Sequence, residues 1–181
     1  MKPITLEYLA IKVEKGFSLA APAFASLRQT VVELGGVKEQ YYGFTDDQNE
    51  STAMDHSYHF QPTSWLVPFR FAEEVRPALA APVCEFAFIA LKETSKPSSI
   101  SESLHKTFTD CYYAKGFTGG NWGIASNSDN RMCVYVLGWE SRADHAAYSK
   151  SALFDVEINK LLPHYAPGSM GLFSKLTQEK S

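Results

Sequence analysis

The stretch GFTGGNWG, residues 116–123, follows the same pattern as GVKEQYYG, residues 36–43, about 80 residues earlier. Both begin with glycine, end in an aromatic residue and a glycine, and follow a long amphipathic segment. Upstream, EYLAI at residues 7–11 parallels EFAFI at residues 85–89. A unit of this length is too long for a solenoid repeat and suits a small β-α-β domain. The pattern predicts two related halves, residues 1–82 with a linker at their end and residues 83–181.

The composition is that of a globular chain with a substantial core. The 181 residues are 45% hydrophobic and 13% aromatic, which argues against disorder. A formal net charge of −3 offers no electrostatic reason to bind nucleic acid or an anionic membrane, and no apolar run reaches the length of a membrane span. The first residues, MKPITLE, become charged too early for a secretory signal. Three dispersed cysteines, Cys84, Cys111 and Cys133, indicate buried thiols in a reducing compartment. We therefore expect a cytoplasmic protein.

Hydrophobic periodicity predicts a strand-helix-strand beginning for the first half. Strands are expected at residues 6–13, 39–44 and 64–69, with a turn at 45–51 and a short helix within 71–82. The helix predicted at 18–34 has Ser18 as its N-cap. Its apolar stripe is expected to face the core through Ala20, Phe24, Leu27, Val31 and Leu34.

The second half has a more complete pattern. Strands are predicted at residues 84–91, 132–139 and 168–176, with a further strand carrying Trp122. Ser99 with Glu102 and Ser141 with Asp144 match capping boxes that start two helices, and residues 149–151 interrupt the second helix. The first of these helices is expected to be buried through Ile100, Leu104, Phe108 and Cys111. The order β-α-β-β-α-β is that of a ferredoxin-like domain.

The stretch VLGWES, residues 136–141, followed by His145, Tyr148, Phe154 and Leu161, resembles the dimeric α+β barrel superfamily. It is most similar to fungal proteins related to antibiotic-biosynthesis monooxygenases. The linker LAAPVCE, residues 79–85, is similar to the link between the halves of tandem members. The resemblance covers nearly the whole chain and implies an α+β fold, with tandem ferredoxin-like repeats forming a pseudodimeric barrel. It is specific for fold and not for reaction, because the superfamily includes oxygenases, polyketide cyclases, decarboxylases, haem-degrading enzymes and non-catalytic members.

The first half departs from this family pattern. Only about twenty residues separate Gly43 from the strand near Trp65, where a full repeat would place a strand and a helix. One interpretation is that this half lacks its second helix. Alternatively, Trp65 corresponds to Trp139 and the helix lies at residues 69–79. The similarity of LVPF, residues 66–69, to the final strand of the family favours the missing helix.

Histidine and tyrosine side chains are the candidate proton carriers. In DHSYH, residues 55–59, His56 and His59 would point to opposite faces of a strand but could converge in a turn or loop. This string is interpreted as an acid-base site, a metal site that needs further ligands, or a solvated edge. His105, Phe108 and Tyr112 share one flank of a predicted helix, which forms either a pocket wall with an acid-base pair or a partly exposed edge.

The resemblance adds a further candidate at Tyr148. In a plant polyketide cyclase of this fold, a tyrosine at this position lines the site, whereas the histidine of that enzyme falls where this chain has Phe154. His145 belongs to the common motif of the fold and is expected to be structural. Aromatic residues of the sheet and helices are expected to contact substrate or to fill the core, namely Trp65, Phe88, Phe108, Trp122 and Trp139.

Glycine-rich nucleotide motifs and a Gly-x-Ser-x-Gly elbow are absent from the sequence, so we expect no cofactor and no metal. The favoured hypothesis is a cofactor-independent enzyme that cyclises or isomerises a small apolar, aromatic or polyketide-derived substrate by acid-base catalysis. Two alternatives stay open, a cofactor-free monooxygenase that uses dioxygen and a non-catalytic binding or stress-related protein. The expected partner is a small molecule and not nucleic acid or membrane. A homodimer is also open, because a missing helix would uncover apolar surface.

Overall fold

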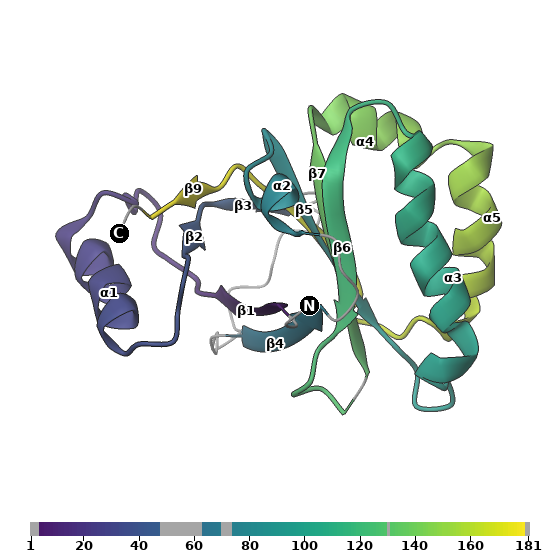
Figure 1. The fold of residues 1–181 in the computed structure, drawn as a ribbon, viewed down its shortest axis with the longest axis horizontal. Coiled ribbons are helices and arrows are strands. Elements are labelled where there is room, and N and C mark those ends of the chain that lie inside the picture. Colours follow the sequence, from purple (N-terminus) through teal and green to yellow (C-terminus); the bar gives the residue numbers. More distant parts are fainter. Residues whose placement is uncertain (1–3, 48–62, 70–73, 130, 180–181) are drawn as a thin grey trace.

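The computed structural model describes residues 4–47, 63–69, 74–129 and 131–179. Within these ranges the chain is an α+β protein, which confirms the predicted fold class. Its centre is an antiparallel five-stranded sheet in the order β3-β8-β5-β7-β6 (Figure 1). The strands, in this order, are β3 (Thr45–Asp47), β8 (Met170–Ser174), β5 (Val83–Ala90), β7 (Met132–Trp139) and β6 (Phe117–Ile124).

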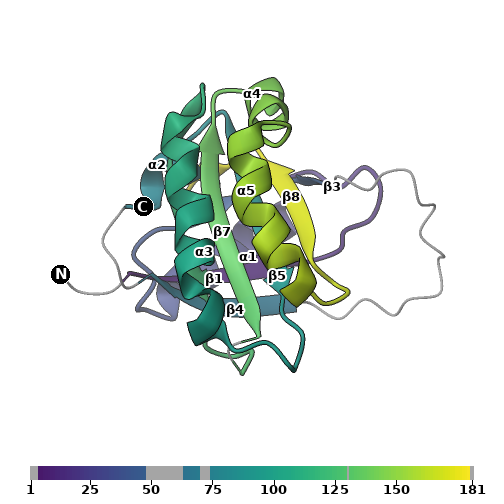
Figure 2. The same cartoon turned by 90° about the vertical axis from the view of Figure 1, so that its right-hand side faces the viewer.

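The second half has the ferredoxin-like topology that its sequence predicts. Strand β5 is followed by α3 (Pro97–Asp110), β6, β7, α4 (Arg142–Tyr148), α5 (Ala152–Leu161) and β8, and the four strands are ordered β8-β5-β7-β6. Short 3-10 turns, η1 (Cys111–Tyr113) and η2 (Leu162–His164), follow α3 and α5. Helices α3 and α5 lie side by side over one face of the sheet (Figure 2).

The helix side of the sheet holds one half of the core. The predicted inner stripe of α3, Ile100, Leu104, Phe108 and Cys111, is buried throughout. It packs against the side chains that β7 directs to this face, which are Cys133, Tyr135, Leu137 and Trp139. Because successive residues of a strand point to opposite faces, the intervening Val134 and Val136 face the other way and are also fully buried. The sheet therefore needs a second cover.

The first half supplies that second cover. Strand β1 (Ile4–Ala10) pairs in antiparallel fashion with β4 (Thr63–Phe69), and this two-stranded sheet packs against the face of the five-stranded sheet opposite to the helices (Figure 1). The Tyr8 ring lies 4.7 Å from that of Phe88 and 5.3 Å from that of Phe86. The backbone N–H of Ser126, in the β6–β7 loop, donates a 2.8 Å hydrogen bond to the carbonyl oxygen of Leu66. The two halves thus cover each other within one chain.

The described strands of the first half do not form one sheet of their own. Strand β1 pairs with β4, β2 (Tyr41–Tyr42) pairs with β9 (Thr177–Gln178), and β3 pairs with β8. The turn predicted at residues 45–51 is wrong in its first part, because the C-terminal strands continue along β2 and β3 and satisfy their backbone hydrogen bonds. A second helix between residues 48 and 62 would lie outside the described residues. The short helix predicted within residues 71–82 is present as α2 (Arg76–Leu79), which lies in the range of the alternative helix at residues 69–79. The boundary between residues 82 and 83 stays a prediction.

Helix α1 (Pro22–Glu33) differs from its prediction. None of its residues is buried, so the expected inner stripe is wrong, and Leu27 and Leu34 are 43% and 80% exposed. The helix lies away from the helix-covered core of the five-stranded sheet (Figure 1), and within the described ranges its apolar stripe meets no core. Ser18 is not its N-cap, because the helix starts at Pro22, whose fixed φ suits the first turn.

The two predicted capping boxes have opposite outcomes. The box at Ser99 does not form, because α3 already begins at Pro97 and the Ser99 hydroxyl donates to the Lys96 carbonyl. The serine cap predicted at α4 is confirmed, since the backbone N–H of Asp144 donates to Ser141 Oγ at 3.1 Å, whereas Asp144 Oδ2 accepts from the Ser141 hydroxyl. The predicted interruption at residues 149–151 separates α4 from α5. No helix in the described ranges is both long and apolar enough to span a bilayer.

Phe88 is the central side chain of the core beneath β1 and β4, so truncating it tests that core. Phe88 is fully buried, whereas Phe44 is half exposed. We expect Phe88→Ala to lower the free energy of unfolding by about 3–5 kcal/mol, and the same change at Phe44 to cost less than about 1 kcal/mol. Urea unfolding measures both. Equal costs would contradict a packed core between the halves.

The buried thiols predict a loss of stability at alkaline pH. Burial raises the pKa of Cys111 and of Cys133 from 9.0 to about 12. In the unfolded chain these thiols ionise near their ordinary value, so a pH above 9 stabilises the unfolded state relative to the native state. The native state therefore keeps this contribution below about pH 9 and loses it as the pH rises toward 12. Urea unfolding between pH 7 and 10 checks the decline, and Cys133→Ala should make it shallower.

Candidate functional site

The structure distributes the predicted site residues over separate places. His56 and His59 lie outside the described residues. The others fall into three groups. Trp65 and Phe88 lie in the core between the β1–β4 pair and the sheet, and Trp139 and Tyr148 lie at the end of β7 and in α4. The remaining group lies along α3, η1 and β6 and consists of His105, Phe108, Tyr112 and Trp122.

The first group is part of the core. The rings of Trp65 and Phe88 lie 4.9 Å apart, and Trp65 stacks on Tyr8 at 6.1 Å. Burial raises the pKa of the Tyr8 phenol to about 12, so it stays protonated at neutral pH. These contacts are those of packing aromatic rings.

In the second group Phe108 is buried in the core, whereas His105 and Tyr112 are exposed and Trp122 is partly buried. Trp122 Nε1 donates a hydrogen bond to His105 Nδ1 at 3.2 Å, so the proton of the neutral ring lies on Nε2. Tyr112 is 49% exposed and makes edge contacts with Phe108 and Phe117, at 5.7 and 5.1 Å between centroids. This flank corresponds to the exposed-edge interpretation, and none of its residues lines the pockets described below.

The third group surrounds a buried carboxylate that the sequence did not single out. Glu85, on β5, is 6% exposed. Its Oε2 accepts a 2.9 Å hydrogen bond from Trp139 Nε1, and its Oε1 lies 3.3 Å from His145 Nε2. The His145 ring also packs edge-on against Trp139 and Phe173, at 5.4 and 4.8 Å. Because both oxygens have partners, this cluster fastens the first turn of α4 to the sheet.

Tyr148 lies on the other side of Trp139, with 5.7 Å between the two ring centroids. Its hydroxyl is 3.4 Å from the carbonyl oxygen of Thr107, which also accepts from the Cys111 thiol at 3.4 Å. Burial, followed by the nearby Cys111, raises the pKa of Tyr148 far above its ordinary value. The phenol therefore stays protonated at neutral pH, and it can donate a hydrogen bond or a proton but cannot act as a base.

Tyr148 reaches a pocket of about 350 Å³, here called the α4 pocket. Asp144 lines the same pocket from one turn earlier in α4. One oxygen of its carboxylate, Oδ2, accepts the Ser141 hydroxyl at 2.6 Å, which leaves Oδ1 outside that bond. The other lining residues are Tyr113, Ala114, Lys115, Ala147, Ser151 and Leu153.

Asp144 is the functional candidate that the sequence analysis missed. The Ser141–Asp144 pattern indicated only a cap, although the spacing of Asp144 and Tyr148, four residues apart, places both on one helix face. The chain also passes close to this carboxylate, since a Cβ at Gly116 would lie 2.6 Å from Asp144 Cγ. The α4 pocket thus combines a carboxylate and a protonated phenol on one helix.

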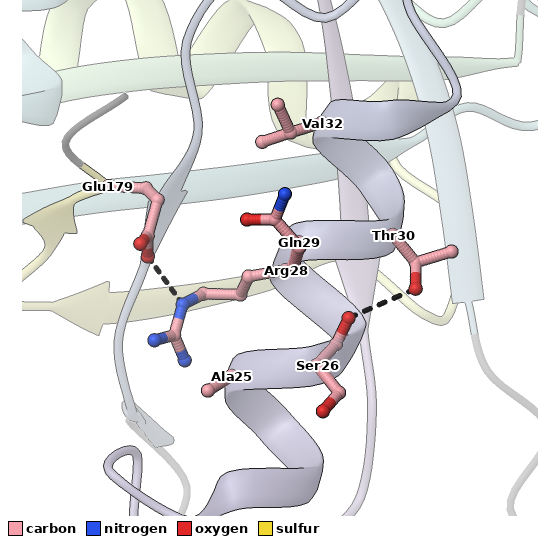
Figure 3. Close-up of a pocket in the computed structure, with 7 residues that line it drawn as sticks. All are labelled: Ala25, Ser26, Arg28, Gln29, Thr30, Val32 and Glu179. Atoms are coloured by element: carbon pink, nitrogen blue, oxygen red, sulfur yellow. Dashed lines mark hydrogen bonds and ion pairs between the residues drawn. The ribbon is translucent and has the colours of Figure 1, made fainter.

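A second pocket, of about 730 Å³, runs along α1 and is called the α1 pocket. Figure 3 shows its lining, which comes from one stretch of α1 together with Glu179 of the C-terminal segment. It holds none of the predicted site residues. Within the ranges that the structure describes, no three His, Cys, Asp or Glu side chains gather closely enough to hold a metal ion.

Comparison with known proteins finds similarity of shape only. No protein-family model and no curated protein matches the sequence. A solved structure described as an antibiotic biosynthesis monooxygenase from Nitrosomonas europaea covers 50% of this chain and 94% of its own, with 16% identity and a TM-score of 0.45.

Two further solved structures match at similar levels. A variant of SnoaB, a cofactor-independent oxygenase from Streptomyces nogalater, covers 55% of this chain and 91% of its own, with 10% identity and a TM-score of 0.42. Hydroxynitrile lyase from Passiflora edulis covers 56% and 96%, with 13% identity and a TM-score of 0.42. These solved structures are similar in shape to about half of this chain, and they assign it neither reaction nor substrate.

Proposed function

We propose that this protein is a cofactor-independent enzyme that isomerises or cyclises a small, largely apolar carbonyl compound in the α4 pocket. The observation that supports this proposal is the presence of Asp144 and Tyr148 on one face of α4, lining the same pocket. A carboxylate can remove a proton from carbon, and a protonated phenol can stabilise the oxygen that becomes negative. The two groups therefore supply complementary halves of a proton transfer.

The proposed reaction is redox-neutral. Asp144 removes the proton from a carbon next to the carbonyl group, and the electron pair of that C–H bond moves into an enolate. Tyr148 donates a hydrogen bond to the enolate oxygen as its charge develops. Returning the proton from Asp144 to another carbon isomerises the substrate. Alternatively, the enolate carbon attacks a second carbonyl within the same molecule, the C=O π electrons move to that oxygen, and the resulting alkoxide takes the proton back from Asp144, which closes a ring.

The lining of the α4 pocket indicates the size and polarity of this substrate. A volume of about 350 Å³ lies within the range of small-molecule sites. Ala114, Ala147 and Leu153 provide apolar surface for most of the substrate. The contact between Glu85 Oε1 and His145 Nε2, at 3.3 Å, holds α4 against the sheet, so it fixes the helix that carries both reacting groups.

A second candidate function is non-catalytic binding of a small molecule. Both reacting groups already have partners within the protein, because Asp144 accepts the Ser141 hydroxyl and the Tyr148 hydroxyl lies near the Thr107 carbonyl. These bonds would serve a helix cap and a core contact even if no reaction took place. The pocket would then bind a ligand by its apolar walls alone.

Isomerisation of cyclohex-3-enone to the conjugated enone, followed by ultraviolet absorbance, tests the two candidates. Asp144→Asn removes the base but keeps an oxygen that can accept the Ser141 hydroxyl, and we expect it to lower the rate about 10²–10⁴-fold. Tyr148→Phe keeps the ring packing and removes the donor, so a loss of about 10²-fold is expected. Glu140→Gln is the matched control, because Glu140 is exposed and does not line the pocket.

The same variants separate catalysis from binding. If the native protein binds cyclohex-3-enone, as seen by chemical-shift changes, but converts none of it, the binding candidate is favoured. If Asp144→Asn retains the native rate, Asp144 is not the base.

A further inference from the structure

Helix α1 is attached to the protein by few contacts. It buries none of its residues. Among the described residues, its side chains make ring contacts only with Phe17 and Tyr42, where Phe24 packs edge-on at 5.7 and 5.6 Å. The Gln40 side chain donates a hydrogen bond to the carbonyl oxygen of Arg28 at 3.1 Å. Apart from these local neighbours, the described interactions of α1 reach one distant residue, Glu179.

Arg28 makes that distant contact. Its Nε donates a hydrogen bond to Glu179 Oε2, an ion pair between residues 151 positions apart in sequence. The guanidinium lies over the rings of Tyr42 and Phe24, at 4.4 and 4.8 Å from their centroids, and Nη1 donates to the carbonyl oxygen of Leu19 at 3.2 Å. Figure 3 shows the arginine side chain extending from the helix toward Glu179. Stacking on the two rings orients the planar guanidinium of Arg28, so its N–H donors are preorganised to bind a carboxylate.

Glu179 lies at the end of a C-terminal segment that has few backbone hydrogen bonds to the rest of the protein. Strand β9 pairs with β2 through Tyr41 with Gln178 and Tyr42 with Thr177. The backbone N–H of Glu179 then donates to the carbonyl oxygen of Gln40 at 2.9 Å. Glu179 therefore reaches α1 from a short edge strand.

Glycines flank α1 on both sides. Gly16 precedes it with φ of +87°, and Gly35 and Gly36 follow it with φ of +74° and +84°. A side chain built at any of these three positions would meet nothing within 4 Å. Beyond them, β2 is held separately, because Arg76 Nε donates to both carboxylate oxygens of Glu39 at 2.8 Å. Backbone rotation at these glycines would therefore move the helix while β2 stays in place.

We propose that α1 is a hinged flap that the Arg28–Glu179 ion pair holds closed against the C-terminal strand. Opening the flap turns α1 about Gly16 and Gly35–Gly36. It also opens the α1 pocket, which lies between the helix and Glu179, and moves Arg28 away from Tyr42. Arg28 stays stacked on Phe24 of the same helix and is then free to bind another carboxylate. In the closed state the C-terminal segment holds α1 in place, because the Glu179 carboxylate is bound to Arg28. The flap is independent of the α4 pocket and of the proposed function.

Amide hydrogen exchange of the full-length chain tests the flap. In Glu179→Gln and in Arg28→Met, we expect amides of α1 to exchange about three to ten times faster than in the native protein, because each change removes a charged hydrogen bond that is partly exposed. Amides of α3 should exchange at the native rate. Glu33→Gln is the matched control, since Glu33 lies on the same helix and accepts a hydrogen bond from Gln29, with none to residues 177–179 in the described part of the chain.

Two outcomes would overturn the flap. Unchanged exchange of α1 in both variants would show that the ion pair does not hold the helix. Equal acceleration in α1 and α3 would show a global loss of stability instead of local opening. Arg28→Lys keeps the charge but loses the Nε donor and the planar stacking, so we expect it to open the flap nearly as much as Arg28→Met. Exchange of Arg28→Lys at the native rate would contradict the role of the stacked guanidinium.

Discussion

The structure depends on covering both faces of strands β5 and β7. Every residue of β7 from Cys133 to Trp139 is buried, so side chains on either face need apolar neighbours. Helices α3 and α5 cover one face, and the paired strands β1 and β4 cover the other. Since each square ångström of apolar surface removed from water contributes about 25 cal/mol, a sheet left bare on one face would forgo much of its stabilisation. The second half has a complete ferredoxin-like topology, but its core is completed by the first half.

The same packing positions the α4 pocket. Glu85 comes from the central strand β5 and faces the helix side, where it binds Trp139 and His145. A buried carboxylate is costly unless its oxygens are satisfied, so the indole and the imidazole are held in place by the requirement to satisfy it. His145 then fixes α4, and α4 carries Asp144 and Tyr148 toward the pocket. Burial of Tyr148 keeps its phenol protonated, which makes it a donor beside a carboxylate.

Much of the second half was predictable from local patterns. The inner stripe of α3, the Ser141 cap and the break between α4 and α5 follow from spacings within one or two helical turns. The same reasoning was wrong for α1, whose apolar stripe has the right spacing but no core opposite to it. Asp144 could not be singled out locally, because its spacing from Ser141 is that of a helix cap and accounts for the residue without a pocket. Of the predicted catalytic residues, Tyr148 lines a pocket, whereas His105 and Tyr112 lie on an exposed edge.

The sequence by itself determined the α+β class, the order of elements in the second half and the core face of α3. These properties depend on hydrophobic period and on caps, which act over a few residues. Only the tertiary structure decided that β3 and β2 pair with the C-terminal strands, that Glu85 meets His145, and that Arg28 meets Glu179. Each of these contacts joins segments far apart in the chain. These partners meet only when the folded chain satisfies backbone hydrogen bonds and buried polar groups, so a local sequence pattern cannot predict them.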